Sequence, residues 1–104
     1  SNSKPNKRKT VSESYERDEK VVQYALRRAN GFCQLCDLPA PFLKKDGTPF
    51  LEVHHIEYLS NGGDDTIENV AAICPNCHRK MHSLNMPSDI NKLKEKAKEK
   101  LSND

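Results

Sequence analysis

The chain of 104 residues is strongly polar, with 35% hydrophobic residues, 31% charged residues and a mean hydropathy of -0.87. It has no run of about 18 apolar residues, which excludes a membrane-spanning helix. Its first residues also lack the apolar segment of a secretory signal. We therefore expect a cytoplasmic chain with one small domain, whose thin hydrophobic core needs a further stabilising element.

The net charge of +2 is unevenly distributed along the chain. Lys and Arg outnumber Asp and Glu by eight to four in residues 1–32, whereas the acids lead by seven to four in residues 33–82. Residues 1–13 are polar without periodicity and are expected to be a disordered basic tail. Such a segment suits contact with a polyanion such as DNA, although a charge run is more often a solvated surface.

The first half of the chain predicts a helix and a strand. A helix is expected over residues 14–30, ending at Asn30-Gly31, because apolar residues recur at helical spacing at Val22, Ala25, Leu26 and Ala29. A hairpin is expected around Asp46-Gly47. A strand is then expected over residues 50–56.

The second half predicts a short strand and two helices. One helical turn is expected at residues 66–69, followed by an apolar strand at residues 70–73 and a helix over residues 77–84. A last helix is expected over residues 88–101, with Ser88 as its N-cap. Its apolar stripe consists of Ile90, Leu93, Ala97 and Leu101.

All four cysteines lie in two Cys-x-x-Cys pairs, Cys33 with Cys36 and Cys74 with Cys77. A two-residue spacer lets a tight turn direct both thiolates at one ion, so the pairs indicate a structural zinc site. Such a site contributes on the order of 10 kcal/mol to folding, which would offset the thin core. Two disulfides are the alternative, although that pairing is typical of secreted chains.

All four histidines lie in the same segment as the cysteines. His78 and His82 are four residues apart and would project from one helix face, while His54 comes from the end of the preceding strand. Three imidazoles around one ion leave a coordination position open, as in catalytic metal sites. His55 would point to the opposite side of the strand and could act as a base. Taken alone, His82 is as readily a surface histidine as a ligand.

These residues form a longer pattern: Leu51-Glu52-Val53-His54-His55-Ile56, Gly62-Gly63-Asp64, Glu68-Asn69-Val70 and Cys74-Pro75-Asn76-Cys77-His78-Arg79-Lys80-Met81-His82. The pattern resembles the HNH nuclease motif, and in particular the zinc-bearing HNH endonucleases of bacterial restriction-type enzymes. The letters of the motif fall on His55, Asn69 and His78. The colicin DNases have a similar series with paired His, Asn and His-x-x-x-His.

The resemblance implies a small α+β fold. Its ββα-metal, treble-clef-like core would cover residues 33–82 and hold the structural zinc, with helices on both sides, in a single domain over residues 14–104. It also implies hydrolysis of DNA phosphodiester bonds in a restriction- or phage-related enzyme.

The resemblance further implies a role for each site residue. His55 would deprotonate the attacking water, and a metal held by His54, His78 and His82 would bind a phosphate oxygen and the leaving 3′ oxygen. The amide of Asn69 would bond across the loop and orient His55. An ordinary turn or cap residue is the alternative for Asn69.

Two positions depart from the family pattern. Tyr58 stands where many members have Pro, and His54 stands where many have Asp or Glu. A site of three imidazoles favours Zn, Ni, Co or Mn over Mg, so the catalytic ion is left open among Mg²⁺, Mn²⁺, Ni²⁺ and Zn²⁺. Arg79 and Lys80 are candidate phosphate contacts, with a solvated surface as the alternative.

Two other functions remain open at this point. A catalytically inactive, zinc-containing DNA-binding module would not need the histidines and Asn69, and a zinc domain for protein interaction would leave the His54-His55 pair unexplained. The small core offers no obvious recognition helix, so we expect salt-sensitive DNA binding with weak sequence preference. Targeting would then come from a larger polypeptide or a partner, and the sequence leaves the oligomeric state open.

Overall fold

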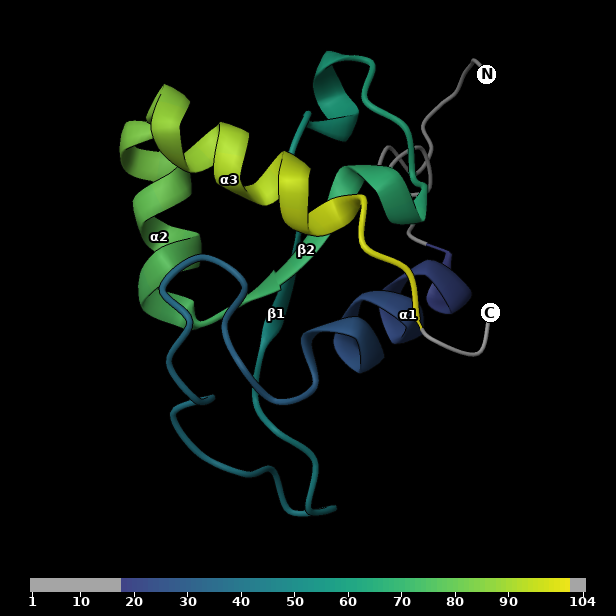
Figure 1. Ribbon diagram of the computed structural model, residues 1–104, viewed down its shortest axis with the longest axis vertical. Helices are drawn as coiled ribbons and strands as arrows, with labels where there is room; N and C mark the ends of the chain where they lie inside the picture. Colours follow the sequence, from purple (N-terminus) through teal and green to yellow (C-terminus); the bar gives the residue numbers. More distant parts are fainter. Residues whose placement is uncertain (1–17, 102–104) are drawn as a thin grey trace, which may run out of the picture.

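The computed structural model describes residues 18–101 (Figure 1). The predicted basic tail, residues 1–13, lies outside the described residues. The elements are α1 (Glu19–Ala29), β1 (Glu52–His55), the 3-10 turns η2 (Leu59–Asn61) and η3 (Ile67–Asn69), β2 (Val70–Ile73), α2 (Pro75–Leu84) and α3 (Pro87–Ala97). This arrangement confirms the predicted small α+β fold with a helix on each side of the core.

Two strands form the sheet in the described part of the chain. β1 and β2 are antiparallel, with His54 opposite Ala71 and His55 opposite Val70. β1 is shorter than the predicted strand over residues 50–56. The expected hairpin around Asp46-Gly47 is a tight turn with one isolated bridge between Leu43 and Pro49 rather than a pair of strands.

The two faces of the β1–β2 sheet pack against different helices. Val53 and Val70 contact Val21 and Ala25 of α1. On the other face a second cluster combines β2 with α2 and α3, through Ala71, Ile73, Cys77, Met81, Leu93 and Ala97 among others. Figure 1 shows α1 on one side of the β1–β2 sheet and the α2–α3 pair on the other. Because side chains alternate along a strand, consecutive residues of β1 are directed to different helices.

The ends of α1 are defined by local caps. Asp18 is extended, with ψ of 118°, and its carboxylate accepts the backbone N–H of Lys20 at 2.9 Å. The helix begins at Glu19, because Asp18 satisfies one of the free amides of the first turn. Residues 14–17 of the predicted helix lie outside the described residues. The predicted end is confirmed, since Asn30 is left-handed with φ of 53° and closes the helix.

The two C-terminal helices begin at prolines. Pro75 and Pro87 occupy the first turns of α2 and α3, where a missing N–H costs nothing. The expected N-cap at Ser88 is wrong, because Met86 holds that position. The predicted end at residue 101 is also wrong: α3 ends at Ala97, and the N–H of Leu101 bonds to the hydroxyl of Tyr24 at 3.1 Å instead of a helical carbonyl. Within residues 18–101 no helix combines the length and apolar character needed to cross a membrane.

A half-buried arginine joins three parts of this fold. The guanidinium of Arg28 donates to the carbonyl oxygens of Ile67 at 2.9 Å, Ala97 at 3.0 Å and Val70 at 2.8 Å. Burial lowers the pKa of Arg28, yet an arginine remains charged at any physiological pH. Arg28 thus ties α1 to the end of α3 and to the start of β2.

Candidate metal centres

The two Cys-x-x-Cys pairs meet in one cluster. The sulfur atoms of Cys33, Cys36, Cys74 and Cys77 all lie within 4.8 Å of one another. A tetrahedral zinc with Zn–S bonds of about 2.3 Å would hold its sulfurs about 3.8 Å apart, a separation that lies within the spread of the four sulfurs. The cluster therefore fits a zinc ion. All four cysteines are free thiols, and the structure therefore does not contain the two disulfides considered as the alternative.

Backbone amides stabilise the sulfurs of the cluster. The N–H groups of Leu35 and Cys36 donate to Cys33 Sγ at 3.4 Å, and the N–H of Cys77 donates to Cys74 Sγ at 3.5 Å. Burial raises the pKa of Cys33, but the amides lower it by more, to about 7. Burial raises the pKa of Cys77, and hydrogen bonds with the side chains of Cys74 and Cys33 raise it further. The thiolate is the form that binds zinc, and the amides favour it at Cys33.

The cysteine cluster is attached directly to the sheet. Gln34, between the first two cysteines, forms two hydrogen bonds of 2.9 Å with the backbone of Ala72 in β2. Its backbone N–H donates to the Ala72 carbonyl, and its side-chain oxygen accepts the Ala72 N–H. From α3, Lys92 donates to the carbonyl of Leu35 at 2.6 Å and to Asp37 at 2.7 Å. The cluster therefore fixes the joint between β2 and α2, the helix that carries His78.

Three histidines form a second cluster. His54 comes from β1, and His78 and His82 lie one turn apart on α2, with ring nitrogens that are all within 4.8 Å of one another. The Nε2 atoms of His78 and His82 are 3.2 Å apart. Metal–nitrogen bonds of about 2.0–2.1 Å in a tetrahedral site place two nitrogens about 3.3 Å apart. The cluster thus fits a single divalent ion with an open position.

Neighbouring side chains orient these imidazoles. Glu52 accepts from Nδ1 of His78 at 2.8 Å, which leaves Nε2 directed at the other histidines. The ring of Tyr58 stacks on His82, with centroids 5.2 Å apart and planes at 23°, and meets the edge of His54. Burial lowers the pKa of His82, with further contributions from His78 and Arg79. A lowered pKa favours the neutral imidazole, the form that binds metals.

Glu52 and Tyr58 are site residues whose roles were not predicted from the sequence. Glu52 precedes His54 by two positions in β1, so strand alternation places both on the same face. That alternation was the available signal for Glu52. Tyr58 had no such signal, because it lies in the irregular segment after β1.

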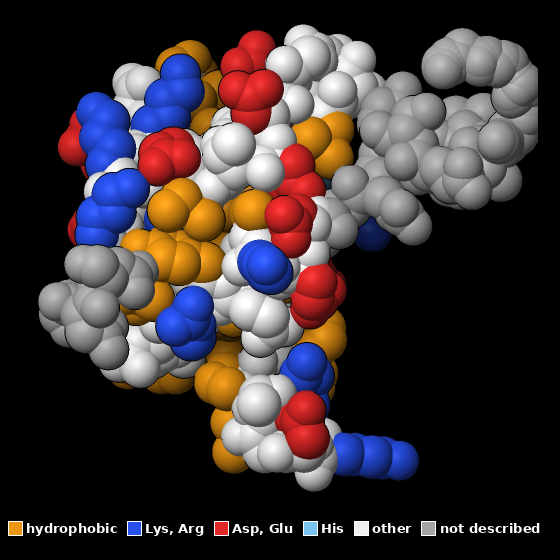
Figure 2. All heavy atoms as spheres, turned by 90° about the vertical axis from the view of Figure 1, so that its right-hand side faces the viewer, with side chains coloured by type: hydrophobic (Ala, Val, Ile, Leu, Met, Phe, Trp, Pro, Cys, Tyr) orange, Lys and Arg blue, Asp and Glu red, His pale blue; other side chains and the backbone are white. Residues whose placement is uncertain are grey.

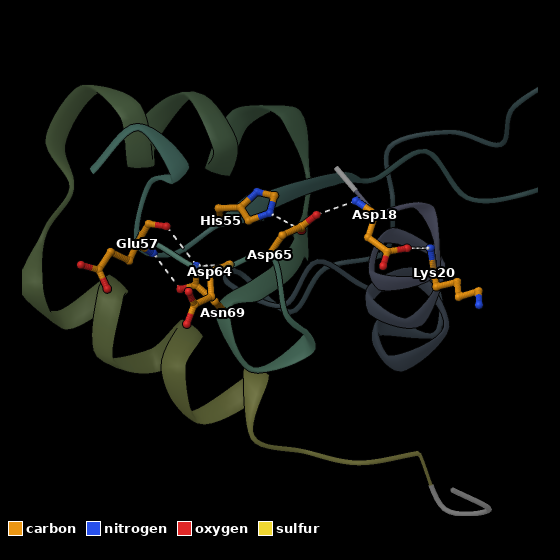
Figure 3. Close-up of polar contacts among 7 residues, drawn as sticks. All are labelled: Asp18, Lys20, His55, Glu57, Asp64, Asp65 and Asn69. Atoms are coloured by element: carbon orange, nitrogen blue, oxygen red, sulfur yellow. Dashed lines mark hydrogen bonds and ion pairs between the residues drawn. The ribbon is translucent and has the colours of Figure 1, made fainter. Parts of the chain in front are cut away.

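His55 is directed to the other face of β1. Its side chain is 8% exposed, and its Nε2 lies 2.7 Å from Asp65 Oδ1 (Figure 3). The second oxygen of Asp65 accepts the backbone N–H of Asp18, at the start of α1. Asp65 was also missed from the sequence, because spacing alone does not say which acid of the Asp64-Asp65 pair turns back towards the strand.

Asn69 fastens the loop after β1 and does not contact the ring of His55. Its amide nitrogen donates to the carbonyls of Glu57 at 3.0 Å and Asp64 at 2.8 Å, and its amide oxygen accepts the N–H of Glu57 at 2.9 Å (Figure 3). Within this loop a Cβ at Gly63 would lie 2.0 Å from the carbonyl oxygen of Glu57. A glycine is therefore required where the loop closes on itself.

Both groups of histidines line one cavity of about 320 Å³. Its wall consists of Val53, His54, His55, Tyr58, Leu59, Ser60, His78 and His82. A group that enters this cavity can therefore meet the three-histidine cluster and His55 together, although the two lie on different faces of the strand.

The candidate phosphate contacts on α2 differ in their surroundings. Arg79 is exposed, whereas Lys80 forms an ion pair of 3.2 Å with Asp89 of α3. Figure 2 shows the face of the molecule turned away from α2, on which basic side chains are interspersed with acidic ones. The charge on this face is therefore balanced locally, and a uniform basic surface does not extend across it.

Similarity to known proteins shows the family of this chain. Residues 33–84, half of the chain, match the family model described as HNH endonuclease. The chain belongs to the HNH endonuclease family. It is 46% identical over 79 residues to the type IV methyl-directed restriction enzyme EcoKMcrA of Escherichia coli (strain K12), a match that covers 76% of this chain.

Further similarity comes from a solved structure and a short protein. The structure of the type IV phosphorothioation-dependent restriction endonuclease ScoMcrA superposes with a TM-score of 0.70 at 32% identity over 86% of this chain. Anaredoxin of Nostoc sp. (strain PCC 7120) is 38% identical over 39 residues, which is 38% of this chain and 51% of anaredoxin. The chain spans only 28% of EcoKMcrA and 20% of ScoMcrA.

Proposed function

We propose that this chain is the nuclease part of a larger, cytoplasmic restriction-type enzyme and hydrolyses DNA phosphodiester bonds with the help of a divalent metal ion. The observation that carries the proposal is the single cavity into which β1 directs His54 and His55. One residue belongs to a cluster that fits a metal ion, and the other is available for proton transfer. A binding module has no need of this juxtaposition.

Each residue then has a definite task. His54, His78 and His82 hold the ion, and His55 accepts the proton of the attacking water. When bound, the ion supplies charge stabilisation at the phosphate and at the leaving 3′ oxygen. Three imidazoles favour Zn, Ni, Co or Mn over Mg. Asn69 keeps the loop beside His55 closed.

The cysteine cluster has a separate, structural role in this proposal. It takes one zinc ion with all four positions filled by thiolates, so no position is left for a substrate. Its ligands come from the loop after α1 and from the start of α2. The bound zinc would therefore fix the position of α2, which carries two of the three histidines. Two ions per chain, one at each cluster, are therefore expected in the active protein.

DNA selection belongs to other parts of the enzyme in this proposal. The names of EcoKMcrA and ScoMcrA refer to methyl-directed and phosphorothioation-dependent restriction, but this chain covers less than a third of either protein. We expect the chain alone to bind DNA mainly through phosphate contacts, with weak sequence preference and strong dependence on salt. A sharp cleavage site produced by this chain alone would contradict that expectation.

A plasmid-nicking assay tests the proposal directly. The zinc-loaded chain, its His55→Ala variant and a Glu95→Gln control on the exposed side of α3 are compared with Mg²⁺, Mn²⁺, Co²⁺, Ni²⁺ and Zn²⁺. We expect nicking that depends on the metal, falls by about 10²–10⁴-fold in His55→Ala, and is unchanged in Glu95→Gln. Binding of DNA without cleavage by the folded wild-type chain, with every metal, would favour the inactive DNA-binding module.

A further inference from the structure

Both oxygens of one loop carboxylate are engaged next to His55. Asp65 Oδ1 lies 2.7 Å from Nε2 of His55, and its other oxygen accepts the backbone N–H of Asp18. Figure 3 shows Asp65 between the imidazole ring and the start of α1. The side chains of His55 and Asp65 are only 8% and 20% exposed. The contact therefore lies largely away from bulk water, where a hydrogen bond to a charged group is strong.

This contact determines which nitrogen of His55 carries the proton. A carboxylate only accepts hydrogen bonds, so the proton between the two groups belongs to Nε2. A neutral imidazole has one N–H, which leaves the lone pair on Nδ1. Within the described part of the chain, Nδ1 of His55 makes no hydrogen bond. Nδ1 is therefore the atom available to take a proton from water.

The carboxylate is held in place by α1. The N–H of Asp18 binds one oxygen at the positive end of the helix, so the other oxygen stays directed at the ring. Asn69 secures the backbone of the same loop through Glu57 and Asp64 and does not contact the ring. The orientation of the base thus has two separate supports, one for the loop backbone and one for the imidazole.

We propose that Asp65 is a positioning residue, fixed by the Asp18 amide, that holds His55 in the tautomer with Nδ1 free to act as the base. The proposal rests on the proposed nuclease function, in which His55 accepts the proton. It differs from a purely structural role, in which Asp65 would only anchor the loop to α1. A structural anchor would affect stability without controlling the position of the imidazole proton.

Nitrogen-15 NMR of the zinc-loaded chain separates these two roles without DNA or a second metal. The spectra are recorded about 1.5 pH units above the ordinary histidine pKa of about 6.5, with His55 assigned by its loss in His55→Gln. We compare wild type, Asp65→Ala, Asp65→Asn and the control Asp64→Asn, which changes the neighbouring acid. Zinc content and melting temperature establish that each variant is folded.

The expected results are specific to each variant. Wild type and Asp64→Asn should show the proton of His55 on Nε2. Asp65→Ala should give a mixture of tautomers. Asp65→Asn should move the proton to Nδ1, because the Asp18 amide takes the side-chain oxygen and turns the NH₂ group towards Nε2. A wild-type tautomer in Asp65→Ala would overturn the positioning role, and a wild-type tautomer in Asp65→Asn would overturn the part assigned to Asp18.

Nicking assays then connect the tautomer to catalysis. Asp65→Asn should lower kcat by about 10²–10⁴-fold, with KM for DNA within about threefold of wild type and activity of Asp64→Asn unchanged. A full kcat in a variant with the wrong tautomer would overturn the catalytic part of the proposal. If wild type nicks no DNA with any metal while the NMR pattern holds, the proposed nuclease function fails but the hold of Asp65 on His55 stands.

Discussion

The cysteine and histidine clusters are two candidate metal-binding sites in one small chain, and they differ in the number of ligands that they supply. The cysteine cluster supplies four sulfurs and is attached to β2 and α3. The histidine cluster supplies three nitrogens and lines a cavity, with His82 exposed. A complete ligand set suits a structural ion, whereas an incomplete set suits an ion that must also bind a substrate. The comparison predicts that losing one cluster costs the fold and losing the other costs the chemistry.

The largest expected effect is on the cysteine side. Cys77→Ser removes a buried ligand, and a structural zinc contributes on the order of 10 kcal/mol, comparable with the whole stability of a small domain. We expect this variant to lose zinc and its cooperative thermal unfolding, measured by zinc analysis and circular dichroism. His82→Ala is the matched ligand variant in the other cluster and should keep both. A cooperatively folded Cys77→Ser without zinc would remove the distinction between the clusters.

The next effect concerns the scaffold shared by both clusters. Arg28→Lys removes the planar guanidinium group that donates to three backbone carbonyls. Because a lysine ammonium can satisfy only some of these carbonyls, we expect the free energy of unfolding to fall by about 2–4 kcal/mol. Urea denaturation measures this change. Arg27→Lys, one residue away on α1, is the control and should change stability by less than about 0.5 kcal/mol. Equal effects of the two variants would contradict the role of Arg28.

On the histidine side, the carboxylate behind His78 should tune metal affinity. Glu52→Gln replaces a charged acceptor by a neutral one at Nδ1 of His78, and we expect the affinity for Co²⁺ at the histidine cluster to fall by about 10–100-fold. Titration of the zinc-loaded chain with Co²⁺, followed by absorbance, measures it. Glu57→Gln is the control, because Glu57 contacts Asn69 through its backbone only. Unchanged affinity in Glu52→Gln would remove Glu52 from the site.

The sequence predicted those features that depend on short spacing. The two cysteine pairs, the i,i+4 histidines and the alternation of His54 and His55 are local patterns, and the small α+β fold is confirmed. The contact of Asp65 with Asp18 and the contacts of Arg28 instead join positions far apart in the chain. Local periodicity carries no information on such pairs. Both ends of α3 were misplaced for a related reason, because caps and contacts with other elements decide where a helix begins and ends.

The smallest expected effect tests whether the open cluster is shaped by packing as well as by ligands. The ring of Tyr58 covers His82 and meets His54, and aromatic pairs of this kind contribute about 0.5–1.5 kcal/mol. Tyr58→Leu should therefore weaken Co²⁺ binding by about 2- to 10-fold, because His82 loses the surface that restricts its ring. Tyr58→Phe keeps that surface and should bind as wild type does. Weakening in Tyr58→Phe as well would show that the hydroxyl group, rather than the stacked ring, acts on the cluster.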